Sequence, residues 1–292
     1  MPNLNQQMRL ADGRMLGYDE RGPSNGTPLF YFHGTPSSRV EFPLFASEET
    51  LQALNIRLIA PDRPGMGLSS YQPNRRFVDW SRDIIALADH LKIERFAVLG
   101  YSGGGVYAVV CAHSIPGRIT KVGVVSGTAP FTLPGLTDTI PADNLRYFAF
   151  SYEKPWLSHL FLKMMGLMTR LAPKQVIINA MSALPEPDRK MMEANPEFQK
   201  GFLGIIQEAI RKGPRGAQHD TRLMVSDWDF NPHDIQIPIY WWHGEEDKNA
   251  PIAMGRHMAK VIPNALAKFF VNEGHLSLFK KNSEDILRSL AG

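Results

Sequence analysis

A serine lies at the centre of the pentapeptide GYSGG, residues 100–104. The apolar run 96–99 precedes it and a run of small residues, 105–113, follows it, which predicts a strand, a sharp turn and a helix. The glycines two positions before and two after Ser102 leave room for that strand and helix to approach closely. Because this G-x-S-x-G pattern exposes the serine hydroxyl, we predict that Ser102 is a nucleophile.

A general base must lie within hydrogen-bond reach of such a serine, since its hydroxyl stays protonated near neutral pH. Of the nine histidines, His275 follows a predicted strand, residues 267–271, and a short turn. Sites in open α/β sheets form at the carboxyl ends of strands. We therefore predict His275 as the base. His243, which also ends a predicted strand, is the alternative, although a carboxylate four residues later is more typical of an acid-bearing loop.

A carboxylate is also needed to orient the base. Glu245, Glu246 and Asp247 lie in the loop after the predicted strand 239–243. Any of the three could face the imidazole, so their spacing leaves the choice open.

The tetrahedral intermediate of acyl transfer carries a negative charge that two N–H donors must meet. One predicted donor is the backbone N–H of Gly103, which follows the nucleophile at the start of a helix, where N–H groups are free. The segment HGTP, residues 33–36, follows the predicted strand 29–32. We assign the second donor to the backbone N–H of Thr35 in that segment.

Short apolar runs and helical stretches alternate on both sides of the chain's middle third. A hairpin is predicted around Asp12 and Gly13, whose types suit a tight turn. The predicted strands are 29–33, 57–60, 96–100, 119–126, 239–243 and 267–271, and the predicted helices are 79–91, 105–113, 252–261 and 277–290. Continuous apolar strands between helices indicate an α/β fold with a mostly parallel sheet covered on both faces.

Residues 131–234 differ from the rest, because they contain no convincing strand and are rich in proline and methionine. They predict short helices interrupted at Pro155, Pro173, Pro185, Pro187, Pro196 and Pro214. The predicted organisation is a core of residues 1–130 and 235–292 with this helical insertion. Methionine adapts to irregular shapes, so the insertion could line a site for a bulky apolar ligand, although filling a small helical core is its more ordinary use.

Composition excludes several classes of function. The 32 basic and 29 acidic residues give a net charge of +3 without a dense basic block, which argues against nucleic acid as a partner. The only cysteine, Cys111, cannot form an intramolecular disulfide, as is typical of a reducing compartment. The first residues lack a secretory signal, and the apolar stretch 156–171 is interrupted by Lys163 and Arg170 and is too short for a membrane span. We expect a cytoplasmic protein.

Four motifs together resemble the α/β-hydrolase superfamily, in its branch of cap-bearing esterases, epoxide hydrolases, dehalogenases and C–C hydrolases. In the family's order they are HGTP at 33–36, DRPGMGLS at 62–69, GYSGG at 100–104, and Gly274 with His275. The second motif is similar to the family's D-x-R-G-x-G-x-S turn, with a proline inserted before the glycine.

The resemblance also selects the acid. The family carries it in an H-G-x-x-D segment, which residues 243–247 match, so the resemblance implies Asp247, with Glu246 as the fallback. The resulting order of serine, aspartate and histidine is the one this fold uses. The resemblance further implies that residues 131–234 are a helical cap over the site.

The implied activity is that of a serine hydrolase that cleaves a carboxylic ester, lactone or related acyl bond of a small apolar substrate through an acyl-enzyme. No metal or organic cofactor is expected. A serine nucleophile disfavours dehalogenase and epoxide hydrolase chemistry. The alternatives are a C–C hydrolase, an aminopeptidase, or a ligand sensor without turnover. An aminopeptidase would need acids in the insertion for the substrate ammonium, and Glu186, Asp188, Glu193 and Glu197 are the candidates.

Overall fold

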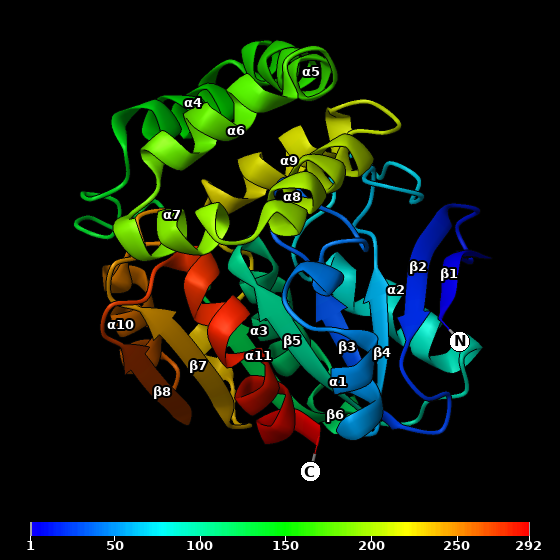
Figure 1. The fold of residues 1–292 in the computed structure, drawn as a ribbon. Coiled ribbons are helices and arrows are strands. Elements are labelled where there is room, and N and C mark those ends of the chain that lie inside the picture. The colour runs from blue at the N-terminus through cyan, green and yellow to red at the C-terminus, as the bar shows by residue number, and fades with distance from the viewer. Residues whose placement is uncertain (1, 292) are drawn as a thin grey trace.

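A single mixed sheet runs through the molecule in the computed structural model, which describes residues 2–291. Within those residues its eight strands lie in the order β1-β2-β4-β3-β5-β6-β7-β8 (Figure 1). Strands β3 to β8 pair in parallel, and β2 pairs antiparallel with both β1 and β4. The bounds are β1 Asn3–Arg9, β2 Met15–Arg21, β3 Thr27–Phe32, β4 Ile56–Pro61, β5 Phe96–Tyr101, β6 Ile119–Val125, β7 Ile239–Gly244 and β8 Ala265–Phe270. The predicted α/β fold and hairpin are confirmed.

Helices cover both faces of this sheet, because alternate side chains of the strands enter two separate cores. Phe96 and Val98 of β5 belong to one core, with α2 Asp79–His90, α3 Gly105–Ser114 and α10 Ile252–Val261. Ala97 and Leu99 belong to the other, with α1 Glu48–Ala53 and α11 His275–Ala291. Burial on both faces explains the continuous apolar runs in the sequence.

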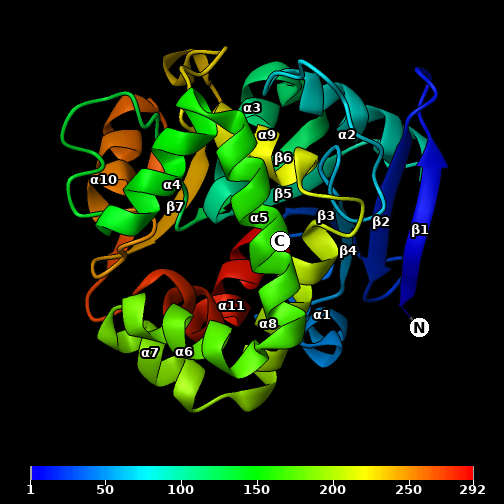
Figure 2. The same ribbon diagram turned by 90° about the horizontal axis from the view of Figure 1, so that it is seen from above.

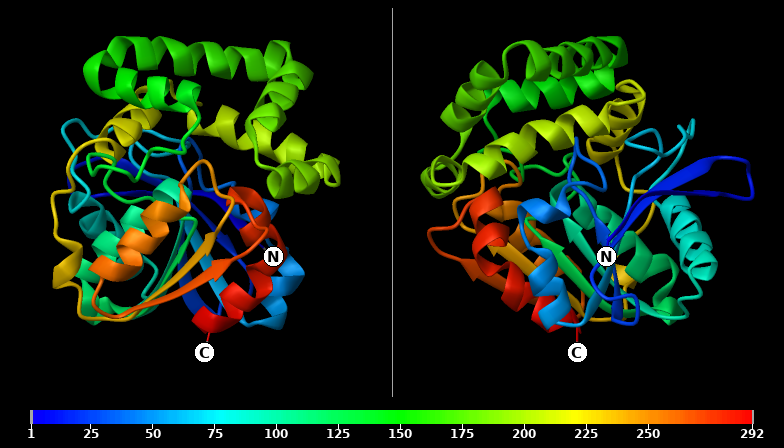
Figure 3. Two further views of the ribbon diagram at one scale, coloured as in Figure 1. Left: turned by 90° about the vertical axis from the view of Figure 1, so that its left-hand side faces the viewer. Right: turned by 45° about the vertical axis from the view of Figure 1, so that its right-hand side comes forward.

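The chain between β6 and β7 forms a layer of helices above the sheet (Figures 1 and 3). Their bounds are α4 Ala142–Glu153, α5 Pro155–Leu171, α6 Pro173–Ala183, α7 Glu186–Glu193, α8 Pro196–Ala209 and α9 Arg215–Met224. We call residues 142–224 the cap helices. The limits predicted for the inserted domain, at 131 and 234, stay a prediction.

Prolines set several boundaries among the cap helices. Pro155, Pro173 and Pro196 are the first residues of α5, α6 and α8, and Pro187 lies in the first turn of α7. Proline is tolerated there because the first N–H groups of a helix have no partner within it. Among residues 2–291, no helix combines the length and the apolar content that a bilayer crossing requires.

The turn from β5 into α3 depends on close backbone packing. Ser102 has a φ of +53°, which is rare for a residue with a side chain. A Cβ at Gly100 would overlap the carbonyl of Gly104, and a Cβ at Gly104 would overlap the carbonyl of Phe32 on β3. The glycines therefore allow the strand, the turn and α3 to pack against β3.

We predict that Gly104→Ala destabilises the protein by ~3 kcal/mol or more, since the new methyl group meets backbone that cannot rotate away. The matched control is Gly204→Ala in α8, where a Cβ would meet nothing within 4 Å. Removing a mid-helix glycine should stabilise that variant by about 0.5–1 kcal/mol. Urea unfolding followed by circular dichroism measures both, and equal midpoints for the two variants would contradict the steric argument.

Candidate active site

Ser102 begins the short helical turn Ser102–Gly104 that leads from β5 into α3, and its side chain is half-buried. The loop after β3 lies against it, because a Cβ at Gly34 would be 3.4 Å from Ser102 Cβ. A Cβ at Gly103 would be 2.6 Å from Thr35 Oγ1. The loop after β3 and the turn after β5 therefore pack against each other at the carboxyl ends of adjacent strands.

His275 and Asp247 are joined by a hydrogen bond of 2.7 Å between Nδ1 and Oδ2, and both side chains are buried. The other carboxylate oxygen of Asp247 accepts from the backbone N–H groups of Asn249, at 2.8 Å, and Ala250, at 2.9 Å. Because the carboxylate only accepts hydrogen bonds, Nδ1 of His275 carries the proton and Nε2 keeps a free lone pair.

The pKa of His275 reflects two opposing effects. Burial disfavours the charged imidazolium, but the carboxylate of Asp247 attracts it and accepts its hydrogen bond. The second effect prevails, so the pKa of His275 lies above its ordinary value. The arrangement holds the imidazole in one tautomer and stabilises it when it takes up a proton.

The backbone of His275 is held close to the end of β5. Its carbonyl accepts from the hydroxyls of Tyr101 and Ser126, each at 3.3 Å. The ring of Tyr101, the residue before Ser102, lies 5.2 Å from the imidazole between centroids. Residues 2–291 contain no hydrogen bond between the Ser102 hydroxyl and the imidazole, so direct contact between the predicted nucleophile and base stays a prediction.

His243, the alternative base, uses both ring nitrogens within the fold. Its Nδ1 accepts from Trp241 Nε1 at 3.2 Å, and its Nε2 donates to the carbonyl of Ala250 at 2.7 Å. The side chain is fully buried, which lowers its pKa. Of the three carboxylates after β7, Asp247 bonds His275, whereas Glu246 is exposed. His243 therefore supports the loop that carries Asp247.

The loop that carries Thr35 is held by the arginine of the DRPGMGLS motif. The buried guanidinium of Arg63 donates to the carbonyls of His33 and Gly34 and, at 2.7 Å, to Thr35 Oγ1. These bonds fix the loop from its carbonyl side. Among residues 2–291 the backbone N–H of Thr35 donates to no protein acceptor, and its role as an oxyanion donor stays a prediction.

The carboxylate of Glu41 also binds the loop that carries Thr35, through a backbone N–H group. Its Oε2 accepts from the N–H of Gly34 at 2.8 Å and from the hydroxyl of Tyr31 at 2.6 Å. Burial raises the pKa of Glu41. Nothing in the sequence distinguished this residue, because its partners lie on β3 and in the loop after it.

Asp220 of α9 joins the cap helices to this loop. It accepts hydrogen bonds from Arg63, Arg75, Tyr107 and the Thr35 hydroxyl. Burial favours its neutral form, but the two guanidinium groups outweigh that effect and hold the pKa of Asp220 well below its usual range. Sequence reasoning missed this residue, since an aspartate in a mixed-polarity helix normally faces water.

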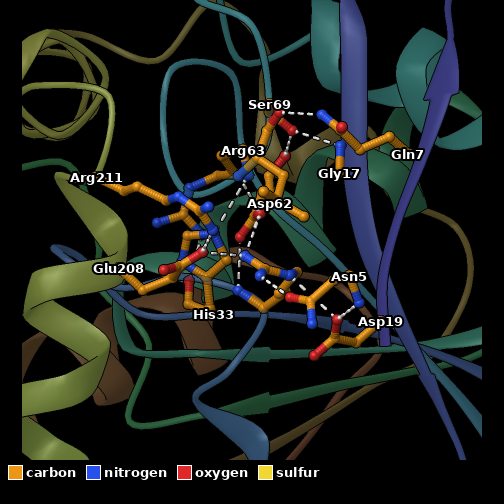
Figure 4. Close-up of polar contacts among 12 residues, drawn as sticks. Asn5, Gln7, Gly17, Asp19, His33, Asp62, Arg63, Ser69, Glu208 and Arg211 are labelled. Atoms are coloured by element: carbon orange, nitrogen blue, oxygen red, sulfur yellow. Dashed lines mark hydrogen bonds and ion pairs between the residues drawn. The ribbon is translucent and has the colours of Figure 1, made fainter. Parts of the chain in front are cut away.

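A neighbouring buried cluster surrounds Arg39 and is partly drawn in Figure 4. Arg39 pairs with Asp19 at 3.1 Å, with Asp62 at 2.9 Å and with Glu208 of α8 at 2.7 Å. Asp62 also accepts from the backbone N–H of Leu68, at 2.8 Å. Burial raises the pKa of Asp62 to about 6 although Arg39 opposes it. The first residue of the DRPGMGLS motif thus closes its own turn and connects it to a cap helix.

Asp188 of α7 caps the helix that His275 begins. Its carboxylate accepts from the backbone N–H groups of His275 at 2.8 Å, Leu276 at 3.0 Å and Ser277 at 2.8 Å. The first N–H groups of a helix have no partner within it, and the positive end of the helix favours an anion. The side chain is fully buried, and burial raises the pKa of Asp188. Sequence reasoning considered it only as a ligand for a substrate ammonium.

Comparison with known proteins agrees with this architecture. A family model described as "alpha/beta hydrolase fold" matches residues 27–282. The chain is 26% identical to a non-heme chloroperoxidase of Streptomyces lividans over 91% of each chain. It is 25% identical to a 2-hydroxymuconate semialdehyde hydrolase of Pseudomonas putida, over 94% of this chain and 88% of that protein. The crystal structure of a hydrolase from Pseudomonas aeruginosa PA01 superposes with a TM-score of 0.71 at 20% identity, covering 99% of this chain and 98% of the other.

We predict that Asp188→Asn lowers the free energy of unfolding by about 1–3 kcal/mol, because it removes the charge that accepts three backbone N–H groups. The matched control is Glu193→Gln, which removes an exposed carboxylate from the same helix and should change stability by less than about 0.5 kcal/mol. Urea unfolding measures both. A variant at position 188 as stable as the control would show that the cap contributes nothing to α11.

Proposed function

The chain belongs to the α/β-hydrolase family, and on that premise we propose that it is a serine hydrolase that cleaves a carboxylic ester, lactone or related acyl bond. The observation that carries the proposal is the buried 2.7 Å hydrogen bond between His275 and Asp247. It prepares an imidazole with a free Nε2 near the end of β5, where Ser102 lies on a strained turn. The catalytic residues proposed are Ser102, His275 and Asp247.

In the proposed reaction Ser102 Oγ attacks the carbonyl carbon while His275 Nε2 accepts its proton. The imidazolium that forms is stabilised by Asp247. The tetrahedral oxyanion accepts from the N–H groups of Thr35 and Gly103. When the intermediate collapses, His275 gives the proton to the leaving group and an acyl-enzyme remains. Water then attacks the acyl-enzyme with His275 as base, and Ser102 is released.

Preorganisation of the oxyanion site supports this proposal. Arg63 and Glu41 bind the loop of Thr35 through its carbonyl and N–H groups on either side. Donors held in place before the reaction need no reorganisation when negative charge develops, which is the source of their contribution to catalysis. A backbone site of this kind suits acyl transfer.

A small apolar acyl substrate is proposed from the side chain that lies beside Gly103. A Cβ at Gly103 would lie 3.0 Å from the sulfur of Met224, which is a buried residue at the end of α9. A methionine beside the proposed oxyanion donors presents an apolar, adaptable surface. The methionines of α5 lie elsewhere, since Met164 and Met168 are exposed and Met165 packs against the small cluster that contains Leu162.

Hydrolysis of a carbon–carbon bond is the second candidate, favoured by the likeness to the protein named 2-hydroxymuconate semialdehyde hydrolase. It would use the same three residues. Aminopeptidase action has less support, because Asp188 binds the start of α11, and Glu186 and Glu193 pair with lysine and arginine of their own helix. A panel of p-nitrophenyl esters, a vinylogous diketone and aminoacyl naphthylamides separates these reactions.

We predict that a fluorophosphonate probe labels the protein and that Ser102→Ala abolishes both labelling and ester turnover, since the variant has no attacking oxygen. Loss of the nucleophile should lower kcat by a factor on the order of 10⁶. The control is Ser182→Ala, an exposed serine of α6, which should label and turn over like the unmodified protein. Equal labelling of the Ser102 variant would refute the proposed nucleophile, and binding of acyl ligands without turnover would favour the sensor alternative.

We predict that kcat/KM falls as the pH drops through the pKa of His275, because the protonated imidazole cannot accept the serine proton. The midpoint should lie above the ordinary value of 6.5, since Asp247 raises that pKa. In Asp247→Asn the midpoint should move to lower pH, because the largest effect opposing burial is removed and only the more distant charges of Asp188 and Glu41 still raise the pKa of His275, and activity should fall about 10³–10⁴-fold.

Measuring pH–rate profiles tests this assignment, with Glu284→Gln on the exposed face of α11 as the control. If Glu246→Gln loses activity while Asp247→Asn keeps it, the acid is Glu246.

A further inference from the structure

Helix α5 places its large apolar side chains on the outside of the protein. It is the outermost of the cap helices, furthest from the sheet in Figures 1 and 3 and in front when the molecule is seen from above in Figure 2. Its buried positions are Ser158, Leu162, Gly166 and Thr169. Three of these four are small or polar, so the face of the helix that packs against the protein is its least apolar face.

The opposite face carries Leu160, Met164, Leu167 and Leu171, which recur at helical spacing. All four are exposed, Leu171 by 71% and Met164 by 57%. Trp156, one turn before Leu160, is 67% exposed. Continuous exposed apolar surface of this extent marks an interaction site rather than ordinary protein surface. The distribution is the reverse of that expected for a helix that only packs on its own core.

Positive charge predominates along this apolar ridge, although the exposed Glu153 directly precedes it. Residues 154–184 contain Lys154, Lys163, Arg170 and Lys174 and no aspartate or glutamate. Among residues 2–291, none of these four cations pairs with a carboxylate. Lys163 and Arg170 are seven residues apart and therefore lie along one flank of the ridge. The whole protein has a net charge of only +3. The excess of positive charge is therefore concentrated on the outer face of the cap helices.

An open groove of about 730 Å³ continues the charged flank. Its apolar lining includes Leu160, Met164 and Leu167 of α5. Its cationic lining includes Arg211, Lys212 and Arg215 together with Lys163 and Arg170, and it contains no carboxylate. Apolar floor and cationic rim together suit a molecule with acyl chains and an anionic head.

We propose that the outer face of α5 docks on an anionic phospholipid surface. A helix with an aromatic and aliphatic face and lysine or arginine beside it lies in the plane of a membrane interface, with its apolar side chains among the acyl chains. The 17 residues of α5 extend for about 25 Å at 1.5 Å per residue, enough to present the whole ridge at once. Trp156 stands at one end, and indole rings favour the level of the head groups.

A second copy of the chain fits this face less well. In a twofold dimer the same patch meets itself, so Lys163 and Arg170 would face their own equivalents with no carboxylate in residues 154–184 to separate them. Anionic lipid supplies the missing negative charge, at roughly 1 kcal/mol for each cation near the surface. The proposal concerns a binding surface and does not depend on the reaction proposed for Ser102.

The test is cosedimentation of the full chain with phosphatidylcholine vesicles that contain phosphatidylglycerol, and with phosphatidylcholine vesicles alone. We expect binding to the anionic vesicles that weakens as salt is added. Leu160→Gln with Leu167→Gln should lower the partition coefficient at least about tenfold, because two apolar side chains are lost from the interface. Lys163→Gln with Arg170→Gln should lower it roughly 30-fold on anionic vesicles and little on neutral ones.

The matched controls are Leu266→Gln, which removes an exposed leucine from the edge strand β8, and Lys260→Gln on α10. Both should bind like the unmodified protein, and circular dichroism confirms that each variant is folded. The proposal is overturned if the unmodified protein fails to sediment with anionic vesicles, or if the controls lose binding equally. It is also overturned if sedimentation velocity shows a dimer that the Leu160 and Leu167 substitutions dissociate while vesicle binding is absent.

Discussion

The hydrogen bond between His275 Nδ1 and Asp247 Oδ2 connects the loops that follow β7 and β8. Its acceptor is fixed by two backbone N–H groups of its own loop, and its donor begins α11, which is packed on the sheet. Because both partners are buried, the bond is shielded from competing water and the imidazole has one orientation. The remaining polar contacts of the site keep the neighbouring loops in place around this pair, and the proposed chemistry depends on that orientation.

Three buried or nearly buried carboxylates of the cap helices contribute to those contacts. Asp188 caps α11, Glu208 pairs with Arg39, and Asp220 binds Arg63 and the Thr35 hydroxyl. Each reaches an element that carries, or directly supports, a proposed catalytic group. Leaving a buried guanidinium without its partner costs about 3–5 kcal/mol, so the ion pairs of the cap helices also stabilise the loops of the site. Changes in the cap should therefore affect the geometry of the site as well as substrate access.

The inner and outer sides of the cap helices carry different kinds of side chain. The inner side places Asp188 and Asp220 in buried hydrogen-bond networks, whereas the outer side of α5 exposes leucine, methionine and tryptophan beside Lys163 and Arg170.

Local patterns in the sequence encode most of the helices and strands of the core. Strands buried on both faces appear as continuous apolar runs, and the glycines around Ser102 record a turn whose backbone is too close for side chains. These features predicted the sheet, the hairpin, the core helices other than α1 and the turn at Ser102, because each depends on residues near one another in the chain. The choice of Asp247 required the family resemblance, since three adjacent carboxylates are equivalent by type and spacing.

The tertiary structure alone decided the partners of Asp188, Asp220 and Glu41. Two of these side chains meet residues 87 to 185 positions away, and no local periodicity encodes such a pairing. It also decided which face of α5 is buried, because the helix packs small residues inward against neighbours whose positions the sequence does not specify. Burial makes an ordinary aspartate a structural anion, and the absence of burial leaves an ordinary leucine exposed. Both outcomes are properties of the assembled chain.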